Sequence, residues 1–177
     1  SLAGTRNLVV FLEALHQVLQ VQPDIAQRIR LDIYGSLDAT SNNSIRSLGL
    51  YSLIVHHGLV DRQKALLAMG SVDCLLLIQN LSSFSSETIP SKVYEYFFSN
   101  RPILGLVYRN NELAAMLTAY SHFVAQADSV DGVKEQLLKI LSLYKTTPFL
   151  WSTGQAATYT TARAVSQLLT LADRNLG

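Results

Sequence analysis

The stretch VDCLLLIQNLSSFSSETIPSKVYEYFFSNRPILGLV, residues 72–107, decides the fold class. It begins with a short apolar run, Asp73 to Ile78, which has the length of a buried strand, and a serine-rich loop follows. Pro90 lies where a helix should start, and the helical pattern continues through Val93, Tyr94, Phe97 and Phe98. A second apolar run, Pro102 to Val107, completes a strand–helix–strand unit, which is typical of a parallel sheet.

The same alternation of strands and helices extends to both sides. Before this unit we expect a helix at 7–21, strands at 31–35 and 53–58, and a short helix near 44–48. A further helix should be capped by Asp61, and its apolar stripe is Ala65, Leu66, Ala68 and Met69. After it we expect helices at 111–119, 130–144 and 156–175, and a short strand at 121–125. The sequence therefore predicts an α/β fold with a doubly wound, Rossmann-like parallel sheet that helices cover on both faces.

The beginning of the sequence is unusual for such a fold. Ser1 to Arg6 lead directly into a helix, whereas a doubly wound domain normally opens with a central strand. Either the fold starts with a helix or the chain lacks its first strand, and we favour the second alternative. The strands that flank the missing one would then have unpaired edges, so we expect either that a few residual residues act as a stub or that the chain self-associates across the gap.

Composition excludes several classes of protein. With 177 residues, 49% hydrophobic and 15% charged, the chain is expected to form a single domain with a real core. A formal net charge of +1 without any basic block does not suggest a nucleic-acid partner or a membrane surface. The single cysteine, Cys74, lies in an apolar run and is interpreted as a small buried hydrophobe. Because one cysteine cannot form a disulfide within the chain, the sequence fits a reducing, cytoplasmic location. No apolar stretch approaches the ~20 residues of a membrane span.

Polar groups after the strand at 73–78 suggest a binding site. Because crossovers in parallel sheets are right-handed, the loops after the strands share one edge, where ligands bind. Glu87 lies in such a loop, and the helix start at Pro90 leaves backbone N–H groups at Ser91 and Lys92 that suit a phosphate. Glu95, farther along this helix, could accept hydrogen bonds from a ribose. The alternative is that Glu87 is an acid favoured by the helix dipole and that Glu95 is a solvated helix residue.

Two glutamates separated by seven residues, Glu87 and Glu95, together with the run PSKVYEYFFSNRPIL at 90–104, resemble retaining GT-B glycosyltransferases of the glycogen-synthase-like superfamily. The resemblance implies that Glu87 contacts the donor sugar and that Glu95 holds the ribose of the nucleotide. It also implies that the diphosphate is bound by the segment Ile89, Pro90, Ser91 and Lys92. Pro90 departs from the family pattern, because many members have glycine there.

Other segments extend the resemblance along nearly the whole chain. The run SLAGTRNLVVFLEAL at 1–15 implies that Arg6 neutralises the donor diphosphate, although Arg6 could equally be a mobile residue near a terminus. The run IVHHGLVDRQKALLAMGSVDCLLLI at 54–78 implies a pocket for the nucleotide base at His57, Gly58, Leu59 and Val60.

The resemblance implies a donor-binding domain over residues 1–177, the C-terminal half of a GT-B fold, with the N-terminal acceptor domain outside this chain. Its ligand would be a nucleoside-diphosphate sugar, bound without a cofactor or metal because fixed positive groups offset the phosphate charge. By analogy with these relatives, the reaction would belong to polysaccharide or cell-envelope biosynthesis, and the acceptor could lie at a membrane surface. The alternative function is a non-catalytic α/β module for nucleotide binding or protein interaction. No convergent metal-ligand cluster is seen, and Trp151 is interpreted as a packing anchor.

Overall fold

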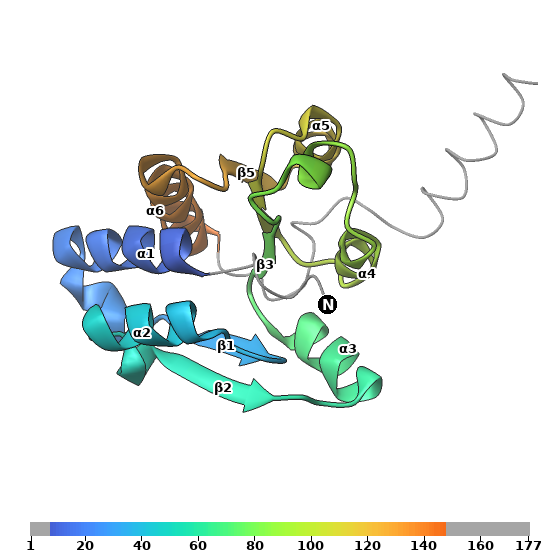
Figure 1. Cartoon of the computed structure of the whole chain (residues 1–177). Coiled ribbons are helices and arrows are strands. Elements are labelled where there is room, and N and C mark those ends of the chain that lie inside the picture. Colours follow the sequence, from blue (N-terminus) through green and yellow to red (C-terminus); the bar gives the residue numbers. More distant parts are fainter. Residues whose placement is uncertain (1–7, 148–177) are drawn as a thin grey trace, which may run out of the picture.

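The computed structural model describes residues 8–147, and these residues alternate between helices and strands (Figure 1). The α-helices are α1 (Val9–Val21), α2 (Ala39–Ser47), α3 (Arg62–Ser71), α4 (Lys92–Phe98), α5 (Asn111–Ala119) and α6 (Val130–Thr146). The strands are β1 (Leu31–Tyr34), β2 (Ile54–Gly58), β3 (Leu75–Ile78), β4 (Ile103–Val107) and β5 (Phe123–Gln126). Short 3-10 helices lie at η1 (Pro23–Gln27), η2 (Tyr51–Leu53) and η3 (Ser83–Ser86). The predicted helix at 156–175 and Trp151 lie outside the described residues.

All strand pairs are parallel, as the strand–helix alternation predicts. They form two sheets, one with the order β1-β2 and the other with the order β3-β4-β5. Among the described residues β1 pairs with β2 alone, and β3 pairs with β4 alone. Strands β1 and β3 therefore each have one edge without a partner strand.

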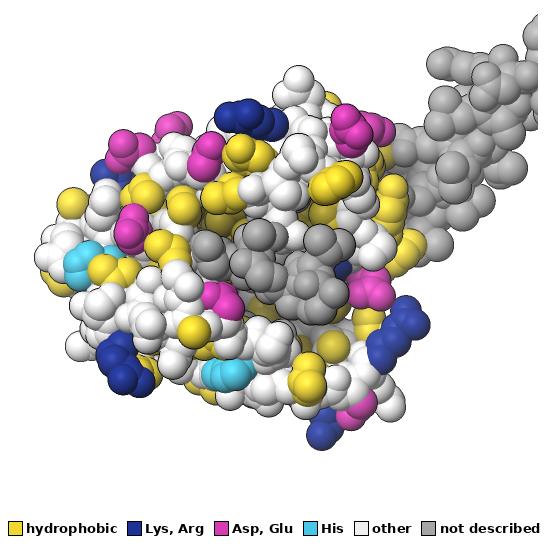
Figure 2. Space-filling view, in the orientation of Figure 1, with side chains coloured by type: hydrophobic (Ala, Val, Ile, Leu, Met, Phe, Trp, Pro, Cys, Tyr) yellow, Lys and Arg dark blue, Asp and Glu magenta, His cyan; other side chains and the backbone are white. Residues whose placement is uncertain are grey.

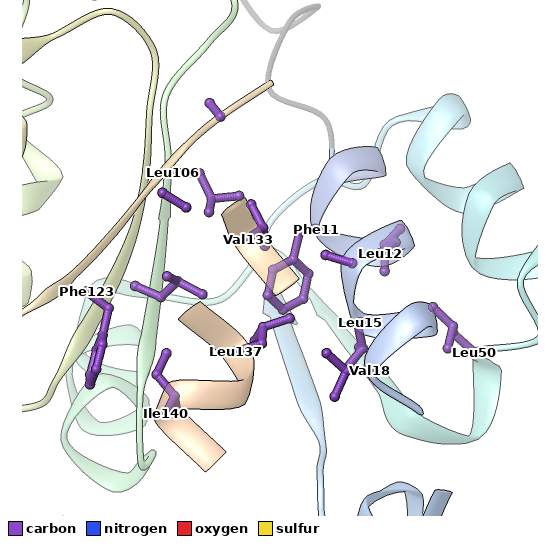
Figure 3. Packing of buried hydrophobic residues seen from close by; sticks show 14 of the residues in the cluster. Phe11, Leu12, Leu15, Val18, Leu50, Leu106, Phe123, Val133, Leu137 and Ile140 are labelled. Carbon is purple, nitrogen blue, oxygen red and sulfur yellow. The ribbon is translucent and has the colours of Figure 1, made fainter. Parts of the chain in front are cut away.

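Helices cover both faces of the three-stranded sheet (Figure 1). On one face α1 and α6 pack against each other and against β4 and β5; Figure 3 shows Phe11 and Leu15 of α1 facing Val133 and Leu137 of α6. On the other face α4 and α5 pack on β3 and β4 through Val93, Phe97, Leu113 and Leu117. This two-sided cover is the reason that β3 and β4 are apolar throughout rather than alternating with polar residues.

Strand β4 lies at the centre of both cores, and all five of its residues are buried. Leu104 and Leu106 belong to the core with α1 and α6, whereas Ile103 and Val107 belong to the core with α4 and α5, as the two-residue period of a strand requires. Gly105 lies against α5, and a Cβ atom there would overlap Cδ1 of Leu117. Glycine at this position therefore lets α5 approach the sheet without displacing the Leu117 side chain.

The two-stranded sheet is less deeply buried, and α3 differs from its prediction. Asp61 caps α3 as expected, with its side chain accepting a hydrogen bond from the Lys64 N–H at 2.8 Å. However, α3 contains no fully buried residue. Of the expected apolar stripe, Ala65, Ala68 and Met69 are half-buried, and Met69 packs against the core of α4 and α5. Leu66 is 45% exposed. The physical reason is that an open hollow lies between α3 and the side chains of Tyr34 and His57, so this face of the helix makes few close apolar contacts.

Two helix boundaries also differ from the sequence prediction. Helix α2 begins at Ala39 rather than near residue 44, because the Asp38 side chain accepts hydrogen bonds from the Ser41 N–H and hydroxyl at 2.9 and 2.6 Å. Helix α4 begins at Lys92, two residues after Pro90, although the Val93 N–H already donates to the Pro90 carbonyl at 2.9 Å. In the part of the chain that the structure describes, no helix has both the length and the apolar composition needed to cross a bilayer.

Candidate functional site

The carboxyl ends of β1 and β2 are joined through backbone groups. The Gly35 N–H donates to the Gly58 carbonyl at 2.7 Å, and His56 Nε2 donates to the Gly35 carbonyl at 2.7 Å. Gly58 has a φ angle of +67°, in the left-handed region that favours glycine, so the chain turns sharply there. The turn places Leu59 on the surface with 89% exposure, whereas Val60 turns back toward α3.

An open hollow of about 610 Å³ lies between this turn and α3. It is lined by Tyr34, His57, Val60, Lys64, Leu67, Ala68 and Ser71. The rings of Tyr34 and His57 stack with centroids 4.3 Å apart and an interplanar angle of 5°. The hollow thus combines a stacked aromatic pair, an apolar wall and one lysine, which suits a planar ring that carries a negative group. Of the residues expected at the base pocket, His57 and Val60 line it.

The His57 ring is held by Asp32, because His57 Nε2 donates a hydrogen bond to Asp32 Oδ1 at 2.7 Å. Arg30 Nε donates to Oδ2 of the same carboxylate at 2.8 Å. Burial opposes ionisation of Asp32, but the hydrogen bonds from His57 and Arg30 outweigh it and keep the pKa of Asp32 below its ordinary value. The carboxylate therefore stays charged and fixes the orientation of the His57 ring. Asp32 is not among the residues expected from the sequence, because a single polar residue within a strand carries no motif.

Glu95 is brought to the beginning of α3. Its Oε1 lies 3.4 Å from Nη2 of Arg62, which follows Val60 by two residues. The Glu95 side chain is 39% exposed and that of Arg62 is 81% exposed, so the pair lies at the surface. This contact joins the segment expected to hold the ribose with the segment expected to hold the base, although they are 33 residues apart in sequence.

Glu87 and the segment 89–92 lie on the loop that leads into α4. Glu87 is exposed, and its backbone N–H donates to the Phe84 carbonyl at 3.3 Å. Ser91 and Lys92 are also exposed, whereas Ile89 and Pro90 are half-buried. Within residues 8–147, no hydrogen bond uses the backbone N–H of Ser91 or Lys92. None of these residues lines the hollow beside α3, so the expected site consists of two parts that meet at the Arg62–Glu95 contact.

Two buried amides hold this loop, and the sequence analysis did not find them. Gln79, 4% exposed, follows β3, and Asn110, 3% exposed, precedes α5. Their side-chain NH₂ groups both donate to the carbonyls of Ser85 and Thr88, which lie on either side of Glu87. The cap position of Asn110 before a helix was a signal that could have identified it.

The remaining residues considered in the sequence are Cys74, Arg6 and possible metal ligands. Burial raises the pKa of the Cys74 thiol to about 12, which fits the interpretation of this residue as an inert hydrophobe. Arg6 lies outside the described residues. No group of three metal-ligating side chains occurs within the described range 8–147. Figure 2 shows charged side chains of both signs scattered over the face in view, without a large patch of one sign.

Comparison with known proteins supports the fold. No protein-family model matches the sequence, and no curated protein sequence matches it. The structure is similar to the crystal structure of the pneumococcal O-GlcNAc transferase GtfA in complex with UDP and GlcNAc, with a TM-score of 0.57 and 17% sequence identity. The fold is Rossmann-like, as in one half of a GT-B enzyme. The similarity covers 94% of this chain and 33% of GtfA, so the chain spans about a third of the length of that protein.

Proposed function

We propose that this chain is the donor-binding domain of a glycosyltransferase, and that it holds a nucleoside-diphosphate sugar at the edge of its sheets. The observation that carries the proposal is the contact of Glu95 with Arg62 at the beginning of α3. It brings α3, which follows the turn at 57–60, next to α4, which follows the loop of Glu87. The turn and the loop each follow a strand, at the edge where parallel sheets bind ligands. The fold shared with a UDP-bound transferase supports this assignment.

The proposed roles follow the order of groups in such a donor. The base lies against His57, Gly58, Leu59 and Val60, with the hollow beside α3 next to it. Glu95 accepts hydrogen bonds from the ribose hydroxyls, and the backbone at Ile89 to Lys92 faces the diphosphate. Glu87 contacts the sugar. Lys92 and Arg62 supply positive charge near the phosphates, and Arg6 is proposed to do so as well.

We also propose that transfer needs a second domain that carries the acceptor site. The enzymes that the sequence resembles are retaining transferases of the glycogen-synthase-like superfamily, with a cleft between two domains. Accordingly, this chain alone is expected to bind nucleotide weakly and to transfer no sugar. Formation of glycoside product by the isolated chain would contradict this part of the proposal.

The test is calorimetric titration of the chain with UDP, GDP and ADP, without added metal, in wild type and Glu95→Ala. Loss of a charge-assisted hydrogen bond of about 1.5–3 kcal/mol should weaken binding of the preferred nucleotide roughly 10- to 100-fold. The matched control is Glu135→Ala, which removes an exposed acid from α6 and should leave affinity unchanged. Unchanged affinity in Glu95→Ala would contradict the ribose role.

A second candidate function is a non-catalytic α/β module. The exposed Arg62–Glu95 pair favours it in one respect, because surface ion pairs of this kind occur without any ligand. In that case none of the three nucleotides would bind the wild-type chain.

A further inference from the structure

The loop between β3 and α4 is fixed by an arrangement of two side-chain amides. Gln79 Nε2 donates to the Ser85 carbonyl at 2.9 Å and to the Thr88 carbonyl at 3.1 Å. Asn110 Nδ2 donates to the same two carbonyls, at 2.8 and 3.2 Å. Each carbonyl therefore accepts two hydrogen bonds, and the two lie on either side of Glu87. We call Gln79 and Asn110 the amide clamp.

The amide clamp is itself held by rigid elements. The Gln79 Oε1 accepts a hydrogen bond from the Tyr108 N–H, just after β4, at 3.0 Å. The Asn110 Oδ1 accepts one from the Leu113 N–H, in the first turn of α5, at 2.9 Å. Because both side chains are almost fully buried, these bonds are shielded from competing water, and each amide uses its acceptor and its donor groups. The loop thus takes its position from β3, β4 and α5.

The loop has few other reasons to adopt this position. Ser83, Phe84, Ser86, Glu87 and Thr88 are all exposed, so little apolar burial holds the segment. Phe84 in particular is 76% exposed. The internal hydrogen bonds of η3 fix its local shape, since the Ser85 N–H donates to the Ser82 carbonyl at 3.0 Å, but they do not anchor it to the sheet. Apart from Ile89, which packs on the core of α4 and α5, anchoring falls to the amide clamp.

We propose that Gln79 and Asn110 are positioning residues, which set the height of Glu87 above the sheet and thereby make the domain discriminate a sugar-bearing nucleotide from the bare nucleotide. The second part rests on the proposed function, in which Glu87 contacts the donor sugar. The amide clamp acts on Glu87 through the backbone on both of its sides, and it does not touch Glu95. Loosening it should therefore cost contacts with the sugar and spare those with the ribose.

The test uses Asn110→Asp, which keeps side-chain size and the acceptor for Leu113 but places an oxygen against the Ser85 and Thr88 carbonyls. Asn110→Ser serves as a second variant, because its hydroxyl can still cap α5 while it buries no charge. The matched control is Asn43→Asp, the same chemical change at an exposed position of α2. Hydrogen exchange followed by mass spectrometry reports loop order, and titration with UDP and UDP-GlcNAc reports discrimination.

In either Asn110 variant, the Glu87 and Val93 amides should exchange about tenfold faster or more, while the β4 amides keep their wild-type rates. The affinity ratio of UDP-GlcNAc to UDP should fall toward one, with UDP affinity retained. Unchanged exchange at 82–93 would overturn the clamp, and so would equal acceleration in β4. Faster loop exchange with an unchanged ratio would overturn the role in discrimination. If the wild type binds none of UDP, GDP, ADP and UDP-GlcNAc, the proposed donor function fails, and the exchange result still decides the clamp.

Discussion

His122 is a buried histidine whose ring nitrogens have no hydrogen-bond partner within residues 8–147. It is 7% exposed and stacks on Phe97, with centroids 5.3 Å apart. Burial lowers the pKa of His122 to about 4 from the ordinary value of 6.5. Protonation is therefore easier in the unfolded chain than in the folded one, and acid favours unfolding.

We expect the free energy of unfolding to fall by about 3 kcal/mol as the pH drops from 6.5 to 4 on account of His122. The stability that the neutral His122 ring allows is fully present above pH 6.5 and is lost as the pH falls toward 4. This is because the pKa of His122 is lower in the folded chain than in the unfolded chain. Urea denaturation at a series of pH values measures this slope. His122→Leu should flatten it, and a slope as steep as that of the wild type would refute the assignment. His16→Leu, on α1, is the control.

At the residue scale, the sequence singles out two acids but not the groups that hold their surroundings in place. Glu87 and Glu95 stand out through their spacing, and their roles stay a prediction; Glu87 lies in the loop after β3 and Glu95 in α4. Gln79 and Asn110 bind backbone carbonyls 6 to 25 residues away, and such contacts leave no periodic pattern in the sequence. Asp32 was missed for the same reason, since its partner His57 is 25 residues away.

At the element scale, the contact between β4 and α5 depends on Gly105. Gly105→Ala should lower the free energy of unfolding by about 1–3 kcal/mol, because the new methyl group overlaps Leu117 in a buried site. Urea denaturation measures the change. Gly70→Ala is the control, since a Cβ there meets nothing within 4 Å and α3 should tolerate it.

Shortening the opposing side chain gives a sharper check. In the double variant Gly105→Ala with Leu117→Val, the free-energy losses of the two single variants should add to more than the loss observed, because the smaller residue makes room for the methyl group. Strict additivity would show that Leu117 is not the residue that the new Cβ meets.

Most elements were predicted from hydrophobic period, and the errors have physical causes. The bounds of α5 were predicted correctly, because Asn110 caps a regular apolar pattern. The start of α2 was missed because its polar sequence resembles a loop, and only the contacts of Asp38 with Ser41 mark the cap. The stripe on α3 is only half-buried, because hydrophobic periodicity cannot reveal how closely the neighbouring elements approach the helix.

At the scale of the whole molecule, the two sheets should differ in stability. Strand β4 is buried throughout and pairs on both sides, whereas β1 and β2 form a two-stranded sheet whose residues are half-buried or exposed. Native-state hydrogen exchange should show amides of β1 and β2 exchanging roughly a hundredfold faster than those of β4. Equal protection would indicate that both sheets open as one cooperative unit.

Fold class was predicted at this scale because strand–helix alternation alone implies parallel strands. The separation of the strands into two sheets within the described residues could not be derived from the hydrophobic periodicity of the sequence, because periodicity is a local property. It depends on which strands find partners, and that is decided over the whole chain.

The half-buried Cys74 beside β3 gives the protein a reporter of its own motion. Cys74 is the only cysteine in the sequence, and its raised pKa leaves almost no thiolate at neutral pH while the strand is in place. Alkylating reagents attack the thiolate, so they should label Cys74 mainly during excursions that expose it to water. The labelling rate of the unmodified chain thus measures how often this part of the sheet opens, and a ligand that bridges α3 and α4 would register as slower labelling.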